Sequence, residues 1–291
     1  MGANGENRAV LLSSKTRRLI HEALREDIGS DDVTSRALLP GLLRGRGLVV
    51  SKQRGIVCGT VIAREVFHRM NPRLRVRILK RDGSRVKRGT RVLWVEGPAA
   101  SILTAERTAL NFLQRLSGIA TLTSKFVRAV RGTRTRILDT RKTTPGWREL
   151  EKEAVQCGGG TNHRMRLDEL ILVKDNHLAL LQKKKSIALA VRHARKKFPG
   201  LPVEVECDRL SQVRQAVEGG ADAILLDNMT PARMKASVRF AGKRAKMEAS
   251  GGVTLHNVRR IAKTGVDFIS VGALTHSAPA MDFSLEIIPG P

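Results

Sequence analysis

From Arg134 onward, short β-rich runs recur along the chain at a spacing that few folds share. The central residues of successive runs are 34, 33, 21, 23 and 21 positions apart. Helical stretches such as 186–198 and 209–220 lie between most of them. Strands that alternate with helices at this spacing predict a parallel sheet, and only six strands are recognisable, so we expect an α/β protein with an open (β/α) barrel. The runs lie at 136–142, 170–177, 203–208, 223–228, 246–252 and 267–273.

The part of the chain before this barrel shows a mixed α+β pattern. Residues 13–27 predict an opening helix, and 102–130 predict one long helix or two that separate near Ser117-Gly118. Between them, 47–98 predicts short strands joined by turns, with a hairpin turn at Asp82-Gly83.

The charge of the chain restricts its partners. Fifty-three Lys and Arg against 27 Asp and Glu give a net charge of +26, which attracts anions of many kinds. Aromatic residues make up only 3% and Tyr is absent, which argues against stacking on single-stranded nucleic acid. The basic stretch 73–92 has two interpretations: a solvated sheet face, or an electrostatic funnel or RNA-binding patch.

The sequence gives no sign of a membrane segment or of a disulfide framework. No apolar run approaches the roughly 20 residues that span a bilayer, and the first residues hold only a four-residue apolar stretch. We therefore expect a cytoplasmic protein. Three widely spaced cysteines, Cys58, Cys157 and Cys207, are expected to be free thiols.

Polar or small residues follow each predicted barrel strand. In a (β/α) barrel the carboxyl ends of the strands form the active-site face, so these residues should meet at one rim. Glycine loops after the last strands lie where such barrels commonly bind phosphate. The residues at the strand ends are Thr140, Arg141 and Lys142, then Lys174, Glu206 and Asp227, and finally Ser250-Gly251-Gly252 and Val271-Gly272-Ala273.

A glycine-rich segment interrupts the first crossover of the barrel. Gly158, Gly159 and Gly160 precede Thr161-Asn162 and the pair His163-Arg164. Such a loop can wrap an anion, and Arg141 and Arg164 can each grip a carboxylate with two hydrogen bonds.

These residues carry a family resemblance. The run DTRKTTPGWRELEKEAVQCGGGTNHRMRLDELILVKDNH (139–177) resembles the signature of quinolinate phosphoribosyltransferases, also called nicotinate-nucleotide pyrophosphorylases. The same is true of ALREDIGSDDVTS (23–35), AERTALNFLQRLSGIAT (105–121), VEVECD (203–208), ILLDN (224–228), EASGG (248–252) and ISVGALTHS (269–277). The resemblance covers nearly the whole chain in order. It implies transfer of phosphoribosyl from 5-phosphoribosyl 1-pyrophosphate to quinolinate, with decarboxylation.

The resemblance also implies domains and partners. An α/β sandwich domain would cover 1–118, the barrel 119–275, and the tail 276–291 would pack with the first domain. The family forms homodimers, with higher oligomers open, and Arg107 would reach into the site of the other subunit. The donor would bring Mg2+, expected near Glu206 and Asp227, although no side chain is assigned as a metal ligand.

Roles follow from the resemblance residue by residue. Arg141, His163, Arg164 and Lys174 would surround quinolinate. Lys142, Glu206 and Asp227 would be catalytic and serve the phosphoribosyl donor. The loops 250–252 and 271–273 would hold its 5′-phosphate.

Four residues depart from the family pattern. Asp31, Ala100, Glu153 and Arg166 stand where Gly, Arg, Tyr and Gly are usual, and none of them is assigned to catalysis.

Three alternative functions stay open at this point. A molybdenum-operon paralogue shares the fold, but the segments GGGTNHR and KDNH favour the quinolinate enzyme. Nicotinate phosphoribosyltransferase uses a mono-acid, and the surplus of Arg argues against it. A nucleic-acid-binding protein on this scaffold rests only on the charge of +26 and lacks interleaved aromatics.

Overall fold

A computed structural model describes residues 12–181 and 186–289 of the chain. It divides into two compact units, one reaching to Thr121 and including the segment from Pro279 onward, the other formed by Leu122–Ala278. The boundaries predicted from the sequence lie three residues before these. The first residues, on which the prediction of a cytoplasmic location rests, lie outside the described ranges. Among the described helices, none is long and apolar enough to cross a membrane.

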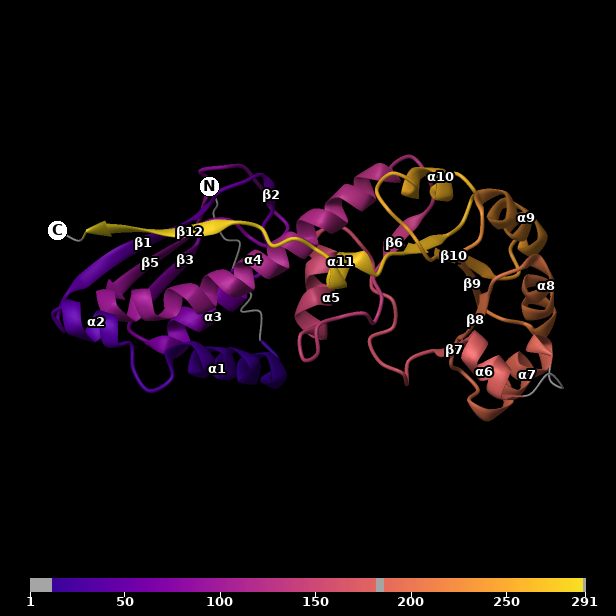
Figure 1. Cartoon of the computed structure of the whole chain (residues 1–291), viewed down its shortest axis with the longest axis horizontal. Coiled ribbons are helices and arrows are strands. Elements are labelled where there is room, and N and C mark those ends of the chain that lie inside the picture. The colour runs from indigo at the N-terminus through magenta and orange to yellow at the C-terminus, as the bar shows by residue number, and fades with distance from the viewer. Residues whose placement is uncertain (1–11, 182–185, 290–291) are drawn as a thin grey trace, which may run out of the picture. The chain divides into compact units, whose positions relative to one another are not determined.

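The first unit is built on an antiparallel sheet, with helices α1, α3 and α4 on one face (Figure 1). The strand order is β12-β1-β5-β3, so the C-terminal strand forms an edge beside β1. These strands are β1 (Arg44–Ser51), β3 (Arg75–Ile78), β5 (Arg91–Pro98) and β12 (Phe283–Pro289), and a separate pair is β2 (Gly55–Ile56) with β4 (Arg85–Val86). The helices are α1 (Ser14–Ile28), α2 (Val33–Leu38), α3 (Thr60–Met70) and α4 (Ala99–Ala129).

The two long helices of this unit were expected, and α4 is a single helix. Ser13 caps α1 by accepting the N–H of Thr16 at 3.1 Å. Helix α4 continues through Ser117 and Gly118, and both residues make contacts with other segments of the chain. The Ser117 hydroxyl accepts the N–H of Cys58 at 2.9 Å, and any side chain at Gly118 would collide with the Pro279 carbonyl.

The prediction of a hairpin at Asp82-Gly83 is wrong. A turn is present there, with Gly83 at φ 83°, but β3 pairs with β5 and β4 pairs with β2. The Asp82 carboxylate instead accepts the N–H of Thr60 at 2.9 Å, at the start of α3. Helix α3 itself replaces part of the expected strand region, and its buried residues Ile62, Ala63, Val66 and Phe67 follow a helical spacing.

The basic strand β3 has the predicted alternation. Arg75 and Arg77 are exposed while Val76 and Ile78 are half-buried. The Arg77 guanidinium lies over the Trp94 ring, 4.7 Å from its centroid, so part of this basic face packs on an aromatic side chain.

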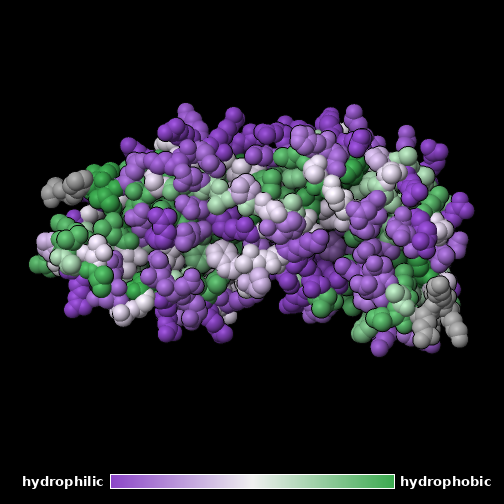
Figure 2. Space-filling view, viewed as in Figure 1, coloured by the Kyte–Doolittle hydropathy of each residue, from purple (hydrophilic) through white to green (hydrophobic). Residues whose placement is uncertain are grey.

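Exposed apolar side chains gather around α2 in the first unit. Leu38 and Leu42 are 74% and 96% exposed. Figure 2 shows hydrophobic residues at the end of this unit where α2 lies in Figure 1. Next to them is a cavity of about 630 Å³ whose lining includes Leu39, Leu43 and Ile287. A contiguous apolar surface of this kind marks a candidate contact with another protein.

The second unit contains a six-stranded parallel sheet in which all six predicted strands form. The order is β6-β11-β10-β9-β8-β7, and the edge strands β6 and β7 do not pair with one another. The open (β/α) barrel is therefore confirmed. Its strands are β6 (Arg136–Leu138), β7 (Ile171–Val173), β8 (Val203–Cys207), β9 (Ala223–Asp227), β10 (Lys246–Ser250) and β11 (Phe268–Ser270). Its helices are α5 (Arg148–Cys157), α6 (Asp175–Leu180), α7 (Ile187–Lys197), α8 (Leu210–Gly219), α9 (Pro231–Ala241), α10 (Val258–Ala262) and α11 (Ala273–His276).

Alternation along the central strands separates the core from the inner face of the barrel. Val205, Leu226 and Ala249 are fully buried and share one orientation in the register of β8, β9 and β10. Their neighbours Glu206 and Glu248 point to the opposite face and line a cavity. Cys58, Cys157 and Cys207 form no disulfide, as expected, and Cys58 and Cys207 are buried.

Candidate active site

A cavity of about 770 Å³ lies at the carboxyl ends of the barrel strands. Fourteen of the fifteen site residues predicted from the sequence line it, and Arg107 does not. Arg107 lies on α4 in the first unit, where its side chain is exposed. The predicted residues around the cavity are Thr140, Arg141, Lys142, His163, Arg164, Lys174, Glu206, Asp227, Ser250, Gly251, Gly252, Val271, Gly272 and Ala273.

Helix α5 holds the loop that carries the first of these residues. The Arg148 guanidinium donates to the Thr143 hydroxyl at 3.0 Å. Glu151 accepts both the N–H and the hydroxyl of Thr144, at 3.1 and 2.9 Å. The loop after β6 is thus fixed by side chains from the next helix, and Arg141 and Lys142 have a defined place.

The same helix fixes the glycine-rich segment through a buried ion pair. Lys152 donates to Asp139 at 2.6 Å and to the His163 carbonyl at 2.8 Å. Asp139 also accepts the N–H of His163 at 2.8 Å. Burial raises the pKa of Asp139, although the hydrogen bond and charge of Lys152 act in the opposite direction. The backbone of His163 is therefore held by both members of the pair.

Two guanidinium groups meet in this cavity. Arg164 donates to the Leu170 carbonyl at 2.7 Å. Burial and then the charge of Arg141 lower the pKa of Arg164, so the two cations act on one another. The Nε atom of Arg141 is buried, and in the described part of the chain it has no hydrogen-bond partner. An unpaired donor beside a second guanidinium is suited to a carboxylate ligand.

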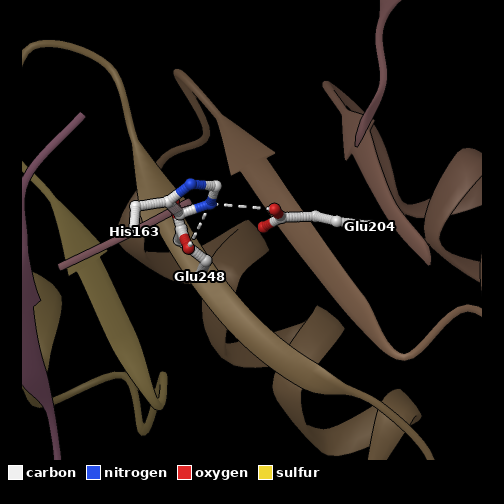
Figure 3. A group of neighbouring side chains, drawn as sticks. All are labelled: His163, Glu204 and Glu248. Atoms are coloured by element: carbon white, nitrogen blue, oxygen red, sulfur yellow. Dashed lines mark hydrogen bonds and ion pairs between the residues drawn. The ribbon is translucent and has the colours of Figure 1, made fainter. Parts of the chain in front are cut away.

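Two glutamates that the sequence analysis did not single out lie against His163 (Figure 3). The Nε2 atom of His163 is 3.0 Å from Glu204 and 3.8 Å from Glu248. Burial lowers the pKa of His163, but the hydrogen bond to Glu204 and the charges of Glu248 and Glu204 outweigh it and the net pKa is raised. Burial and the charge of Glu204 raise the pKa of Glu248 to about 8. A signal was available: each glutamate lies between two buried apolar residues of its strand, on the face that also carries Glu206 or Ser250.

A second pair of acidic side chains lies further along the rim. Burial raises the pKa of Glu206, Lys174 lowers it, and the charge of Asp227 raises it again. The two carboxylates are therefore close enough to repel each other. Paired carboxylates of this kind can accept hydrogen bonds from hydroxyl groups or from the water molecules around Mg2+, an ion that prefers oxygen ligands.

Glycine loops close the cavity at the last two strands. Gly251 has φ +89°, and any side chain there would collide with the Asn228 amide. A Cβ at Gly272 would come within 3.0 Å of Lys142. Within the described residues, the N–H groups of Gly251, Gly252 and Gly272 donate no hydrogen bond. N–H groups that have no partner and belong to residues without a side chain are suited to an oxyanion.

The loops at the start and end of the barrel are joined. The Thr275 hydroxyl donates to the Lys142 carbonyl at 2.7 Å.

The four departures from the family pattern lie elsewhere, since none of them lines the cavity. Asp31 pairs with Arg36 at 2.6 Å, and Arg166 pairs with Asp168 at 3.1 Å.

The fold and this site define a class: an α/β-barrel transferase whose cavity presents guanidinium groups, paired carboxylates and glycine loops to anionic substrates. The chain belongs to the quinolinate phosphoribosyltransferase family. Residues 119–286 match the family's C-terminal domain and residues 32–117 its N-terminal domain. The family predicted from the sequence is thereby confirmed.

Individual relatives agree with this assignment. The chain is 39% identical to the probable nicotinate-nucleotide pyrophosphorylase [carboxylating] of Bacillus subtilis, with 93% of each chain covered. It is 41% identical to the nicotinate-nucleotide pyrophosphorylase [carboxylating] of Mycobacterium leprae, covering 93% of this chain and 95% of that one. The solved structure of the Francisella tularensis nicotinate-nucleotide pyrophosphorylase superposes with a TM-score of 0.90 at 38% identity, covering 98% and 100% of the two chains.

Proposed function

We propose that the protein transfers the phosphoribosyl group of 5-phosphoribosyl 1-pyrophosphate to quinolinate, with loss of CO2 and pyrophosphate. The product is nicotinate mononucleotide, and the reaction belongs to de novo NAD biosynthesis. One observation carries the proposal: Arg141 and Arg164 meet in a cavity where the buried Arg141 Nε atom has no partner among the described residues. A ligand with adjacent carboxylates satisfies those donors.

The acid substrate belongs at the end of the cavity that holds these cations. Arg141, His163, Arg164 and Lys174 would surround its two carboxylates, and each guanidinium can bind one of them with two parallel hydrogen bonds. A mono-acid such as nicotinate would leave one guanidinium without its partner, so the same groups discriminate against it.

The phosphoribosyl donor belongs at the other end, between the paired carboxylates and the glycine loops. Glu206 and Asp227 would hold ribose hydroxyls and the water shell of the donor's Mg2+, which supplies compensation for the pyrophosphate charge. The loops 250–252 and 271–273 would take the 5′-phosphate, because the N–H groups of Gly251, Gly252 and Gly272 there have no partner in the part of the chain that is described.

The reaction follows from this placement. The ring nitrogen of quinolinate attacks the anomeric carbon as the carbon–oxygen bond to pyrophosphate breaks. Glu206 and Asp227 stabilise the positive charge that develops at that carbon. The nitrogen becomes a pyridinium, whose charge stabilises the electron pair left on the ring when the neighbouring carboxylate departs as CO2. Lys142 then gives a proton to that ring carbon. Most of the rate enhancement comes from position and electrostatics.

The proposal includes a homodimer in the cytoplasm. Arg107 is exposed on α4 of the first unit, and it would serve the site of the other subunit, as the family resemblance implies. The exposed Leu38 and Leu42 supply apolar surface for such an assembly.

An absorbance assay tests the function directly. Purified protein with quinolinate, phosphoribosyl pyrophosphate and Mg2+ should form nicotinate mononucleotide, and nicotinate in place of quinolinate should give no product. Equal turnover of both acids would contradict the proposed selectivity. No turnover of either acid by folded dimers would contradict the proposed reaction.

A further inference from the structure

The His163–Glu204–Glu248 cluster lies at the wall of the cavity, which His163 and Glu248 line (Figure 3). Glu204 comes from β8 and Glu248 from β10, two strands that are separated by β9 in the sheet. Their side chains are only 2% and 4% exposed, and His163 is 13% exposed. The mechanism above uses His163 but assigns no task to either glutamate.

The His163 ring is held on one edge only. Its Nε2 atom makes the contacts at 3.0 Å to Glu204 and 3.8 Å to Glu248. Figure 3 shows Nδ1 on the opposite edge of the ring from both carboxylates. Within the described residues Nδ1 makes no hydrogen bond, and His163 lines the cavity. With Nε2–H directed to a carboxylate, the ring presents Nδ1 to a ligand.

We propose that Glu204 and Glu248 are positioning residues for His163: together they fix its Nε2 edge, so that a protonated Nδ1 faces a carboxylate of the acid substrate. This inference rests on the proposed function for the identity of that substrate. In this proposal the two glutamates act through the ring, although Glu248 also lines the cavity.

The surroundings of the ring favour its charged form. Two carboxylates lie near it and one cation opposes them, and His163 has a raised pKa despite its burial. Glu204 is the direct ion-pair partner, because it is 0.8 Å closer to Nε2 than Glu248 is. The charged groups that act on the ring are Glu204 on β8, Glu248 on β10, Asp139 after β6 and Lys152 on α5.

The two glutamates have different parts in this arrangement. Each has a buried Oε1 atom without a partner in the described residues. A proton on Glu248 lets the two carboxyl groups hydrogen-bond to each other, which satisfies both atoms. Burial and the nearby Glu204 charge raise the pKa of Glu248, which agrees with this division. Glutamine reproduces a neutral carboxylic acid, so it should replace Glu248 well and Glu204 badly.

Steady-state kinetics and NMR test the inference together. Glu204→Gln should raise KM for quinolinate about tenfold or more, the factor that corresponds to about 1.4 kcal/mol, and should leave KM for the phosphoribosyl donor within about twofold. Glu248→Gln should change KM for quinolinate by less than about threefold. Asp267→Asn is the matched control, because Asp267 lies on the same sheet just before β11, where it accepts the N–H of Met247 and does not line the cavity.

The His163 pKa provides a measurement that does not depend on turnover. In protein labelled with 13C at histidine Cε1, and assigned with His163→Gln, the His163 resonance should titrate above the ordinary value of 6.5. Glu204→Gln should lower that pKa, and Asp267→Asn should leave it unchanged. This measurement in the unaltered protein also covers the case in which Glu204→Gln does not fold.

Several results would overturn the inference. They are an ordinary or lowered His163 pKa in the unaltered protein, an equal rise of both KM values in Glu204→Gln, and equal losses in Glu204→Gln and Glu248→Gln. A stoichiometric metal ion in the purified protein that both variants lose would also overturn it, because a metal would then occupy the cluster. Failure of quinolinate turnover alongside a raised His163 pKa would contradict the proposed function instead.

Discussion

Lys152 Nζ lies 2.6 Å from Asp139 Oδ1, and neither side chain is exposed to solvent. Both residues also hold the backbone of His163, through its carbonyl and its N–H. The glycine-rich segment and the loop after β6 are thus attached to one buried ion pair. Removal of either partner leaves an uncompensated charge in the core.

Lys152→Met should therefore destabilise the protein strongly. We expect a loss of about 3–5 kcal/mol in the free energy of unfolding, measured by denaturant titration, because the Asp139 carboxylate loses its buried partner. Lys235→Met, at an exposed position of α9, should change stability by less than about 0.5 kcal/mol. A loss of under 1 kcal/mol in Lys152→Met would show that Asp139 is stabilised in another way.

Arg141→Ala and Arg164→Ala should each lower kcat/KM for quinolinate by about a hundredfold or more, since each removes a charge-assisted pair with a substrate carboxylate. Arg166→Ala is the control, because Arg166 is two positions further on, pairs with Asp168 and does not line the cavity. Efficiencies within about threefold of the unaltered protein for both Arg141 and Arg164 variants would show that this assignment of the site is wrong.

Gly251→Ala and Gly252→Ala form a matched pair for the donor end of the cavity. Both glycines have positive φ, but only at Gly251 would a Cβ collide, with the Asn228 amide. Gly252→Ala adds backbone strain of about 1 kcal/mol, whereas Gly251→Ala must also displace Asn228. We expect Gly251→Ala to raise KM for phosphoribosyl pyrophosphate more than Gly252→Ala, with KM for quinolinate little changed in both. A larger rise of this KM in Gly252→Ala than in Gly251→Ala would show that the 250–252 loop does not bind the donor.

The stability of the barrel should fall as pH rises above neutrality. His163 has a folded-state pKa above 6.5, so its contribution is complete below about 6.5 and is lost as pH rises through the folded value. The Glu248 carboxyl binds its proton more tightly in the folded state. Its contribution to the free energy of unfolding is therefore lost as pH rises from the ordinary pKa of 4.5 to the folded-state pKa of about 8. In a His163→Gln/Glu248→Gln double variant, the free energy of unfolding should depend less on pH from 6 to 9. An unchanged slope would exclude both groups as its source.

Subunit mixing tests the placement of Arg107. Arg107→Ala and Lys142→Ala should each be nearly inactive as homodimers. If Arg107 serves the partner's cavity, a mixed dimer contains one doubly altered and one intact site, so equal mixing with exchange should recover about a quarter of full activity. No recovery after exchange, with dimers confirmed by light scattering, would place Arg107 in its own subunit's site or outside both.

The parallel part of the fold could be predicted from the sequence because each strand and each helix carries its own signal. Val203–Cys207 and Ala223–Asp227 are short β-rich runs that carry Glu206 and Asp227 near their ends, and both form strands whose acids line the cavity. Local pattern was less informative in the first unit. Asp82-Gly83 forms a turn, yet the partners of its flanking strands lie elsewhere in the chain and no hairpin results.

The missed part of the site depends on contacts between distant segments. Glu204 and Glu248 meet at His163 only because β9 separates β8 from β10 by one strand and the barrel curves. Lys152 is one of several charged residues in 148–153, and only the burial of its side chain against Asp139 distinguishes it. Strand order and curvature decide such pairs, and neither is encoded in residue spacing alone.

The position of β6 in the sheet has a consequence during synthesis. Its partner in the sheet is β11, which lies 132 positions later in the chain, and β1 likewise receives β12 only from the C-terminal end. At about 5–20 residues per second, β6 waits on the order of ten seconds for β11 to be made. During that interval each nascent unit has an unpaired strand edge able to join another chain. Strands β11 and β12 therefore cover edges that stay open until late in synthesis, and chains that stop before β11 should depend on chaperones far more than chains that contain both strands.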